Sequence, residues 1–285
     1  MFPIVLLLLA FAESLAAQPI KVWERGQGNH FQKFVKPVNQ KSIDIPNLIS
    51  KNLFDVQYQK KSDYQGYYLS HLLKSYDSNK DTALLHISNG MRVPIPMALI
   101  QDHSFDPFIA VKMIGPKGNP QPFPKLMRKD SRFNDPRPLV FTTNKLVISH
   151  DRVPLKDHRA GLNPFRFTTS LEAIEMINYK SWLKQFSVNS SPETDIGLKI
   201  FASRCQYCHG VRSVGATFGW DFVEPLAIYQ KRSPENLLLH VKFQKMDAVP
   251  RGLLMPPQFD FSPHESKALW QWLKNSALKA QQAYQ

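Results

Sequence analysis

The chain has 285 residues, a net charge of +13 at neutral pH and an apolar share of 43%, which leaves room for two domains and excludes a disordered or fibrous composition. Its two cysteines lie only three positions apart, which excludes a disulfide framework that would hold an extracellular fold together. The 22 prolines against 12 glycines indicate that at least one region is rich in loops or strands rather than helices.

The first 17 residues have the pattern of a secretory signal peptide. An unbroken apolar run from Ile4 to Ala12 is followed by small residues, and cleavage is expected after Ala16 or Ala17. The run is about half of the roughly 20 apolar residues that a membrane span needs, which disfavours an uncleaved anchor. No Lys or Arg precedes the run, which departs from the usual pattern. We therefore expect export to the periplasm and a mature chain without a transmembrane segment.

Residues 18–190 are expected to form a mainly β domain. The Asn89-Gly90 dipeptide separates two apolar runs and is a strong signal for a tight hairpin turn. The strands predicted beside this turn and further along the chain are 83–88, 91–95, 108–114 and 139–148. Residues 64–76 have helical spacing, whereas residues 171–186 fit either a strand followed by a helix or a single helix.

The positive charge is concentrated in this first domain. Residues 18–190 hold 25 Lys and Arg against 14 Asp and Glu, whereas residues 191–285 hold 11 against 8. For an exported protein this charge favours an acidic protein surface, an anionic lipid or an anionic substrate as partner over nucleic acid. A basic, solvated face with no dedicated partner is the open alternative. Five histidines in the central and later parts of this domain lack helical ligand spacing, so we expect no second metal site there; they are His71, His86, His103, His150 and His158.

Cys205, Cys208 and His209 form the Cys-x-x-Cys-His pattern of covalent c-type haem attachment. Positions i, i+3 and i+4 of a helical turn share one face, so both thiols can reach the vinyl groups of one haem while the imidazole binds its iron. A thioredoxin-like redox pair would need a βαβ setting, and a zinc site would need a second pair of ligands. The sequence indicates neither. We therefore expect one covalently attached haem c, with His209 as an axial ligand of the iron.

The flanks of this motif resemble the class I cytochrome c family. A first helix is predicted before the motif, and it contains Gly197 where the family uses a glycine for a close helix crossing. After the motif, Ser262-Pro263-His264-Glu265 is a capping box that opens a last helix, and Trp272-Leu273 matches the pair that crosses the first helix in the family. Another helix is predicted to start at Ser233-Pro234-Glu235. The resemblance implies an all-α cytochrome c domain over residues 191–285.

The segment Arg251-Gly252-Leu253-Leu254-Met255-Pro256-Pro257 resembles the axial-methionine loop of the same family. The resemblance implies that Met255 is the second axial ligand, and a thioether ligand raises the reduction potential of the iron. Met246 lies close enough in sequence to compete, and an open or His-ligated site also stays open. One departure concerns the family's Gly-Pro-x-Leu stretch, whose carbonyl orients the histidine ligand. This chain reads Gly219-Trp220-Asp221-Phe222, so the partner of His209 is left unassigned.

Parts of the first domain resemble the molybdopterin-binding oxidoreductase domain of the sulfite-oxidase type. The resemblance rests on residues 53–58 and 67–73, on the Asn89-Gly90 hairpin and on Val93-Pro94-Ile95-Pro96. That family holds molybdenum through a cysteine thiolate, and residues 18–190 contain no cysteine. The resemblance therefore implies a metal-free scaffold that docks or orients the cytochrome.

The sequence thus predicts an α+β protein with a signal peptide (1–17), a mainly β domain (18–190) and an all-α class I cytochrome c domain (191–285). The expected function is that of an exported monohaem c-type cytochrome that transfers single electrons between redox partners, with an acidic docking surface on the partner. Two alternatives stay open. One is a haem enzyme, for example one that oxidises a sulfur anion or reduces peroxide at an exchangeable sixth position. The other is a haem-bearing subunit of a larger oxidoreductase complex. Contact with a membrane surface also stays open.

Overall fold

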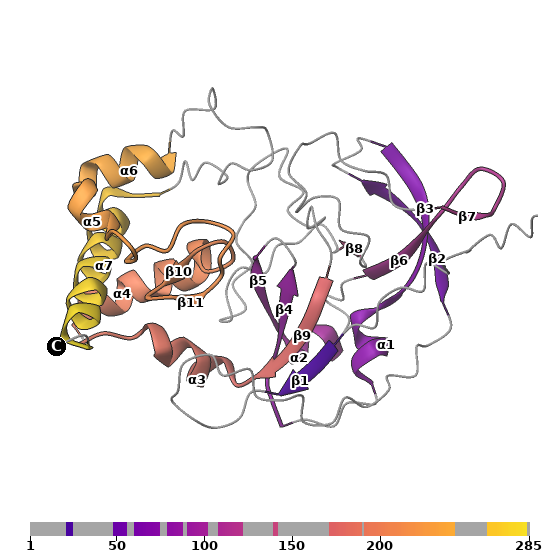
Figure 1. Cartoon of the computed structure of the whole chain (residues 1–285), viewed down its shortest axis with the longest axis horizontal. Coiled ribbons are helices and arrows are strands. Elements are labelled where there is room, and N and C mark those ends of the chain that lie inside the picture. Colours follow the sequence, from indigo (N-terminus) through magenta and orange to yellow (C-terminus); the bar gives the residue numbers. More distant parts are fainter. Residues whose placement is uncertain are drawn as a thin grey trace, which may run out of the picture.

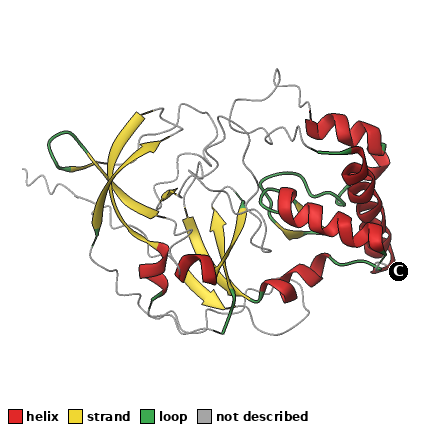
Figure 2. Cartoon of the chain, turned by 180° about the vertical axis from the view of Figure 1, so that it is seen from behind, coloured by secondary structure: helices red, strands yellow, loops and turns green. Residues whose placement is uncertain are grey.

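The computed structural model describes residues 21–24, 48–55, 60–74, 79–87, 90–101, 108–121, 139–141, 171–189, 191–242 and 261–283. Within these residues the protein is α+β: two β-sheets form the N-terminal part, and helices dominate the C-terminal part (Figure 1). A four-stranded sheet lies in the middle, between the second sheet and the helices, and the view from behind in Figure 2 shows the same order. The predicted signal peptide lies outside the described residues.

The central sheet contains the predicted hairpin and has the strand order β1-β9-β4-β5. Its strands are β1 (Lys21–Glu24), β4 (Thr82–Ile87), β5 (Arg92–Pro96) and β9 (Leu171–Ile177). The β1–β9 pair is parallel, whereas β4 pairs antiparallel with both β5 and β9. In the β4–β5 turn, Ile87 N–H donates to Met91 O at 3.0 Å and Gly90 N–H donates to Ile87 O at 2.9 Å. Gly90 has φ +96°, as expected for a three-residue hairpin loop that ends in a left-handed residue.

The second sheet is antiparallel and corrects one helix prediction. Its strands are β2 (Ile49–Asp55), β3 (Lys60–Tyr68), β6 (Phe108–Ile114), β7 (Pro120–Gln121) and β8 (Leu139–Phe141). Strand β6 coincides with the predicted one, and only the start of the predicted strand 139–148 lies within the described residues. The helix predicted for 64–76 is wrong over its first residues, because Tyr64 and Tyr67 are buried in β3, which pairs with both β2 and β6. Helix α1 covers only Leu69–Leu73. Aromatic residues favour strands when they pack between neighbours on a sheet, which explains the difference.

The connection between the sheets and the helices is a strand followed by a helix, the first of the two alternatives for residues 171–186. Strand β9 leads through Asn178, whose side chain accepts from Ser181 N–H, into α3 (Tyr179–Leu183). The 3₁₀ turn η2 (Lys184–Phe186) follows directly. A polar N-cap residue ends the extended strand and starts the helix, which a periodicity count does not detect.

The C-terminal part contains the predicted helices and a small hairpin between them. Its elements are α4 (Pro192–Ile200), the π-helical turn η3 (Phe201–Cys205), β10 (Gly210–Val211), β11 (Val214–Gly215), α5 (Ile228–Lys231), α6 (Pro234–Lys242) and α7 (Pro263–Ala283). The predicted capping box of α7 is confirmed, because Glu265 N–H donates to Ser262 Oγ and Ser262 N–H donates to the Glu265 carboxylate. Ser233 likewise caps α6 by accepting from Asn236 N–H.

Helices α4 and α7 cross with their backbones in close contact at Gly197. A Cβ atom at this position would lie 2.4 Å from both Ala268 O and Trp272 Cβ. Trp272 is fully buried there and packs against Phe201, with 4.9 Å between the ring centroids. The crossing that the sequence predicted from Gly197 and Trp272 is therefore present.

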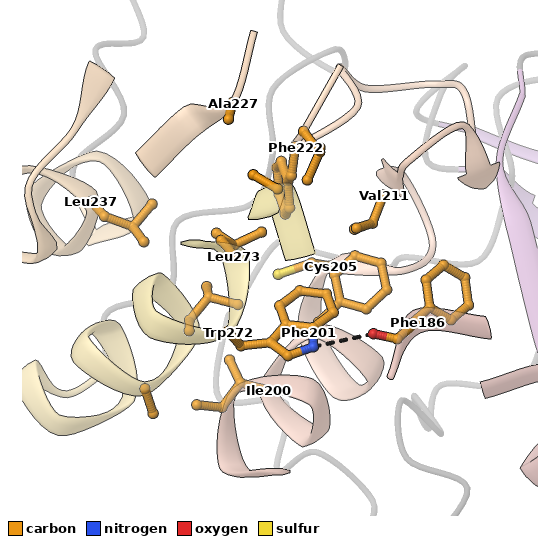
Figure 3. Close-up of a cluster of buried hydrophobic side chains, with 14 of the residues drawn as sticks. Phe186, Ile200, Phe201, Cys205, Val211, Phe222, Ala227, Leu237, Trp272 and Leu273 are labelled. Carbon is orange, nitrogen blue, oxygen red and sulfur yellow. Dashed lines mark hydrogen bonds between the residues drawn. The ribbon is translucent and has the colours of Figure 1, made fainter. Parts of the chain in front are cut away.

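One hydrophobic cluster joins the central sheet to the helices. Leu84 of β4 and Ile177 of β9 belong to the same buried cluster as Phe201 and Trp272. The connecting segment contributes Phe186, whose carbonyl accepts from Trp272 Nε1–H (Figure 3). The sheet and the helices therefore share a core. No helix within the described part of the chain is long and apolar enough to cross a membrane.

Candidate functional site

The two cysteines and the histidine of the motif lie on one helical turn at the end of η3. Gln206 N–H donates to Phe201 O at 3.0 Å, and this separation of five residues between donor and acceptor defines a π turn. Cys208 N–H and His209 N–H then donate to Cys205 O at 3.1 and 3.0 Å. Single π turns inside helices are frequent at functional sites. The structure therefore brings Cys205, Cys208 and His209 together as expected for positions i, i+3 and i+4.

The imidazole of His209 is held by a backbone carbonyl that the sequence left unassigned. His209 Nδ1 lies 2.8 Å from Trp220 O. A carbonyl only accepts, so Nδ1 carries the proton and Nε2 keeps its lone pair. Phe222 stacks on the ring at 4.3 Å between centroids. Burial lowers the pKa of His209, partly opposed by the Trp220 bond, so the neutral imidazole, the form that binds a metal, is favoured.

Gly219 allows the chain to pass directly over this imidazole. Its N–H donates to Cys208 O at 2.6 Å, and a Cβ on it would lie 2.5 Å from Cε1 and 2.7 Å from Nδ1 of His209. No larger residue fits without moving the ring. The sequence contained the glycine, but nothing in its spacing pointed to this contact.

Asp221 fixes the hairpin that follows the motif. The β10–β11 turn places Arg212 at φ 56° and Ser213 at φ 60°, a left-handed pair that normally requires Gly or Asn. The Asp221 carboxylate accepts four backbone N–H groups, and the donors are Arg212, Ser213, Val223 and Glu224. These charge-assisted bonds offset the strain and hold the segment that carries the Trp220 carbonyl.

The thiols do not have the environment of a reactive redox pair. Cys205 is buried and Cys208 is partly buried, and burial raises the pKa of both thiols to about 12. Cys205 is also the last residue of η3 and Cys208 follows it closely, so both thiols lie near a helix C-terminus, where the carbonyl dipoles disfavour a thiolate. Redox-active cysteines have a lowered pKa, commonly at a helix N-terminus. Burial therefore keeps both sulfurs protonated near neutral pH.

The remaining predicted site residues fall into two groups. Met255 and Met246 lie outside the described residues, as do His103, His150 and His158. The other two histidines lie within the described residues: His71 is exposed, and His86 Nε2 lies 2.8 Å from a carboxylate oxygen of Glu175. The described residues contain no group of three or more His, Cys, Asp or Glu side chains arranged to hold a metal ion.

Comparisons with protein-family models, with curated proteins and with solved structures found no match. The function must therefore be inferred from the site itself. It offers two thiols and one imidazole nitrogen on a single helical turn, with the other imidazole nitrogen already bonded.

Proposed function

We propose that this protein is an exported monohaem c-type cytochrome that transfers single electrons between redox partners. The observation that carries the proposal is the His209 imidazole, which shares a helical turn with Cys205 and Cys208 and has Nδ1 bonded to the Trp220 carbonyl. A bond at Nδ1 fixes the tautomer and the ring orientation of a metal-binding histidine and leaves Nε2 for the metal. The resemblance of the flanks to class I cytochromes c supports the same function.

The residues of the site fit a covalently attached haem. Cys205 and Cys208 would form thioether bonds, and His209 Nε2 would bind the iron from one side. Gly219 has no side chain that would overlap the imidazole, and Phe222 stacks on the ring and restricts its rotation. When bound, the haem supplies an iron that changes its oxidation state by one electron.

The residues around the site would limit the structural rearrangement that accompanies this change of charge. The Trp220 carbonyl stabilises the Nδ1 proton, and this bond raises the basicity of the ligand in proportion to its strength. Phe201, Trp272 and Leu273 exclude water from the side of Cys205 (Figure 3). A rigid, dry surrounding reduces the reorganisation that accompanies electron transfer.

The first experiment asks whether the pigment is covalently bound. The chain, exported together with haem-attachment machinery, should give a red protein whose colour stays with the polypeptide in acidified acetone. Cys205→Ser and Cys208→Ser should each lose one thioether bond, and the double variant should release all pigment to the solvent. A colourless wild-type protein, or one that releases its pigment, would contradict the proposal.

The second experiment tests the other axial ligand, which stays a prediction. Met255→Ala should abolish the sulfur-to-iron charge-transfer band at the red end of the oxidised spectrum, because the thioether is lost. Met246→Ala is the matched control and should keep the band. The reverse pattern would assign Met246, whereas a wild-type protein that lacks the band and binds cyanide or peroxide would favour the haem enzyme.

We also propose export by the N-terminal segment and an acidic redox partner. The cleavage pattern at Ala16 and Ala17 and the basic surplus of residues 18–190 support these two points. The N-terminal sequence of the mature protein tests the first. The second predicts that partner reduction slows steeply as ionic strength rises.

A further inference from the structure

Two backbone hydrogen bonds join the β4–β5 hairpin to the haem-attachment motif and to the segment after it. Arg92 N–H donates to Tyr207 O at 3.0 Å, and Tyr207 lies between the two motif cysteines. Thr217 N–H donates to Gly90 O at 2.9 Å. Tyr207 also packs against the hydrophobic core of the central sheet. The hairpin is therefore bonded to both ends of the stretch between residues 207 and 217.

The contact at Gly90 is close enough to exclude any side chain. A Cβ on Gly90 would lie 2.5 Å from Thr217 Oγ1 and 2.9 Å from Phe218 N. The second of these neighbours is backbone, which cannot rotate away as a side chain can. Gly90 is thus required both for the left-handed conformation of the turn and for the approach of residues 217 and 218.

Residues 217–220 connect this contact to His209. Thr217 is bonded to the hairpin, Gly219 is bonded to Cys208, and the carbonyl of Trp220 accepts from His209 Nδ1. At the far end of the segment, the Asp221 carboxylate accepts from the N–H groups of Arg212 and Ser213 in the β10–β11 turn. One end of the segment is bonded to the hairpin and the other end is bonded to the β10–β11 turn. A shift of the hairpin would therefore change the position of the Trp220 carbonyl relative to the imidazole.

We propose that Gly90 is a positioning residue for His209, and that the β4–β5 hairpin sets the Trp220 carbonyl against the imidazole through residues 217–220. The inference rests on the proposed function, because it assigns a role toward the iron ligand. The first domain thereby supports the imidazole from outside the helical part. The strength of the Nδ1 bond tunes the ligand, so the hairpin contributes to the reduction potential.

The chain offers a matched control for this contact in the turn between β6 and β7. There Gly115 N–H donates to Asn119 O and Gly118 N–H donates to Gly115 O, both at 2.9 Å, which is the hydrogen-bond pattern of the β4–β5 turn. Gly118 has φ +74°, and a Cβ on it would meet nothing within 4 Å. Gly118→Ala therefore imposes the same kind of backbone strain as Gly90→Ala, without the contact.

The experiment compares the full-length haem protein with Gly90→Ala and Gly118→Ala. Gly90→Ala should change the equilibrium constant of one-electron reduction by about threefold or more and shift the iron–histidine stretching band, because the imidazole bond changes. Gly118→Ala should leave both readouts at wild-type values. If Gly90→Ala yields no haem protein, Thr217→Pro is the second variant. It removes the N–H that donates to the Gly90 carbonyl and leaves the hairpin sequence unchanged, and the same shifts in the reduction equilibrium and in the iron–histidine band are expected.

Each outcome decides the inference. Wild-type potential and wild-type histidine band in Gly90→Ala, or in Thr217→Pro where that variant replaces it, overturn the positioning role while the proposed function stands. Equal shifts in Gly90→Ala and Gly118→Ala also overturn it, since strain alone would then explain both. A wild-type protein without covalently bound haem overturns the proposed function and this inference with it.

Discussion

Trp220 acts through its backbone, because its side chain is 83% exposed while its carbonyl holds His209. If the proposed haem is bound, Trp220→Ala should therefore leave the visible spectrum of the protein unchanged. Gly219→Ala should lower the yield of haem-bearing protein about tenfold, because the added methyl group overlaps the imidazole, and changes around a metal ligand have effects of this size. Haem absorbance per mole of purified protein measures both. Equal yields from the two variants would contradict this account of His209.

The Asp221 carboxylate offers a second test at the residue scale. Asp221→Ala should lower the free energy of unfolding by about 3 kcal/mol, because four backbone donors lose a charged acceptor. Asp221→Asn keeps one carbonyl oxygen for three of these donors and should lose about half as much. Urea denaturation measures the difference. Two variants of equal stability would show that the bonds to the carboxylate are not what stabilises this turn.

The raised thiol pKa values predict how the haem-free protein reacts. With the pKa of Cys205 and Cys208 at about 12, the thiolate fraction should rise about tenfold for each pH unit across the neutral range. Alkylation by iodoacetamide should therefore keep accelerating between pH 6 and 8. A rate that levels off near pH 7 would indicate the lowered pKa of a redox pair and would count against the proposed function.

At this scale the sequence predicted what side-chain spacing encodes. Cys205, Cys208 and His209 came from a short motif, and the Ser262 cap came from a local pattern, so both could be read without the fold. The Trp220 carbonyl could not, because every residue has a carbonyl and only the fold selects one. The role of Gly219 was hidden for the same reason.

The crossing of α4 and α7 determines how the helical elements pack. An ordinary helical Gly→Ala substitution stabilises a helix by roughly 0.5–1 kcal/mol. Gly197→Ala should instead destabilise the protein by about 3 kcal/mol, because the new methyl group overlaps Ala268 O and Trp272 Cβ. Thermal unfolding followed by circular dichroism measures the change. A stabilised variant would mean that the helices are not in close contact at this position.

The elements that the sequence predicted well are those whose signals are local. The β4–β5 hairpin follows from a turn dipeptide, and helices α6 and α7 follow from their first residues. Residues 64–68 were assigned to a helix because their apolar spacing fits one, yet in β3 all of them pair with β6 and the first three pair with β2 as well. Pairing with β6, which lies 40 or more positions away, is not visible in a local window.

The shared core makes a prediction for the whole molecule. Leu84 lies in the central sheet but packs in the hydrophobic cluster of the helices, so the two should unfold together. Leu84→Ala should lower the free energy of unfolding by about 3 kcal/mol. The midpoint should shift equally in the Soret absorbance, which reports the haem surroundings, and in the far-ultraviolet circular dichroism, which reports the sheets as well.

The outer sheet provides the control for this experiment. Met113 is buried in a separate cluster of the second sheet, away from the helices. If the sheets and the helices were independent units, Leu84→Ala and Met113→Ala would both leave the Soret midpoint unchanged. That result would contradict a shared core.

The topology of the central sheet has a consequence for the order of folding. Its first strand, β1, pairs in parallel with β9. In a chain that emerges N-terminus first, Lys21 can therefore pair with Ala173 only after about 150 intervening residues have emerged. Until β9 arrives, β4 has β5 on one side and no strand on the other, and the β4–β5 hairpin has no completed sheet beside it. Residue 177, where β9 ends, precedes Cys205 by fewer than 30 positions. In such a chain the four-stranded sheet can therefore be completed just before the two cysteines emerge. The cysteines would then fold against a hairpin that is already formed.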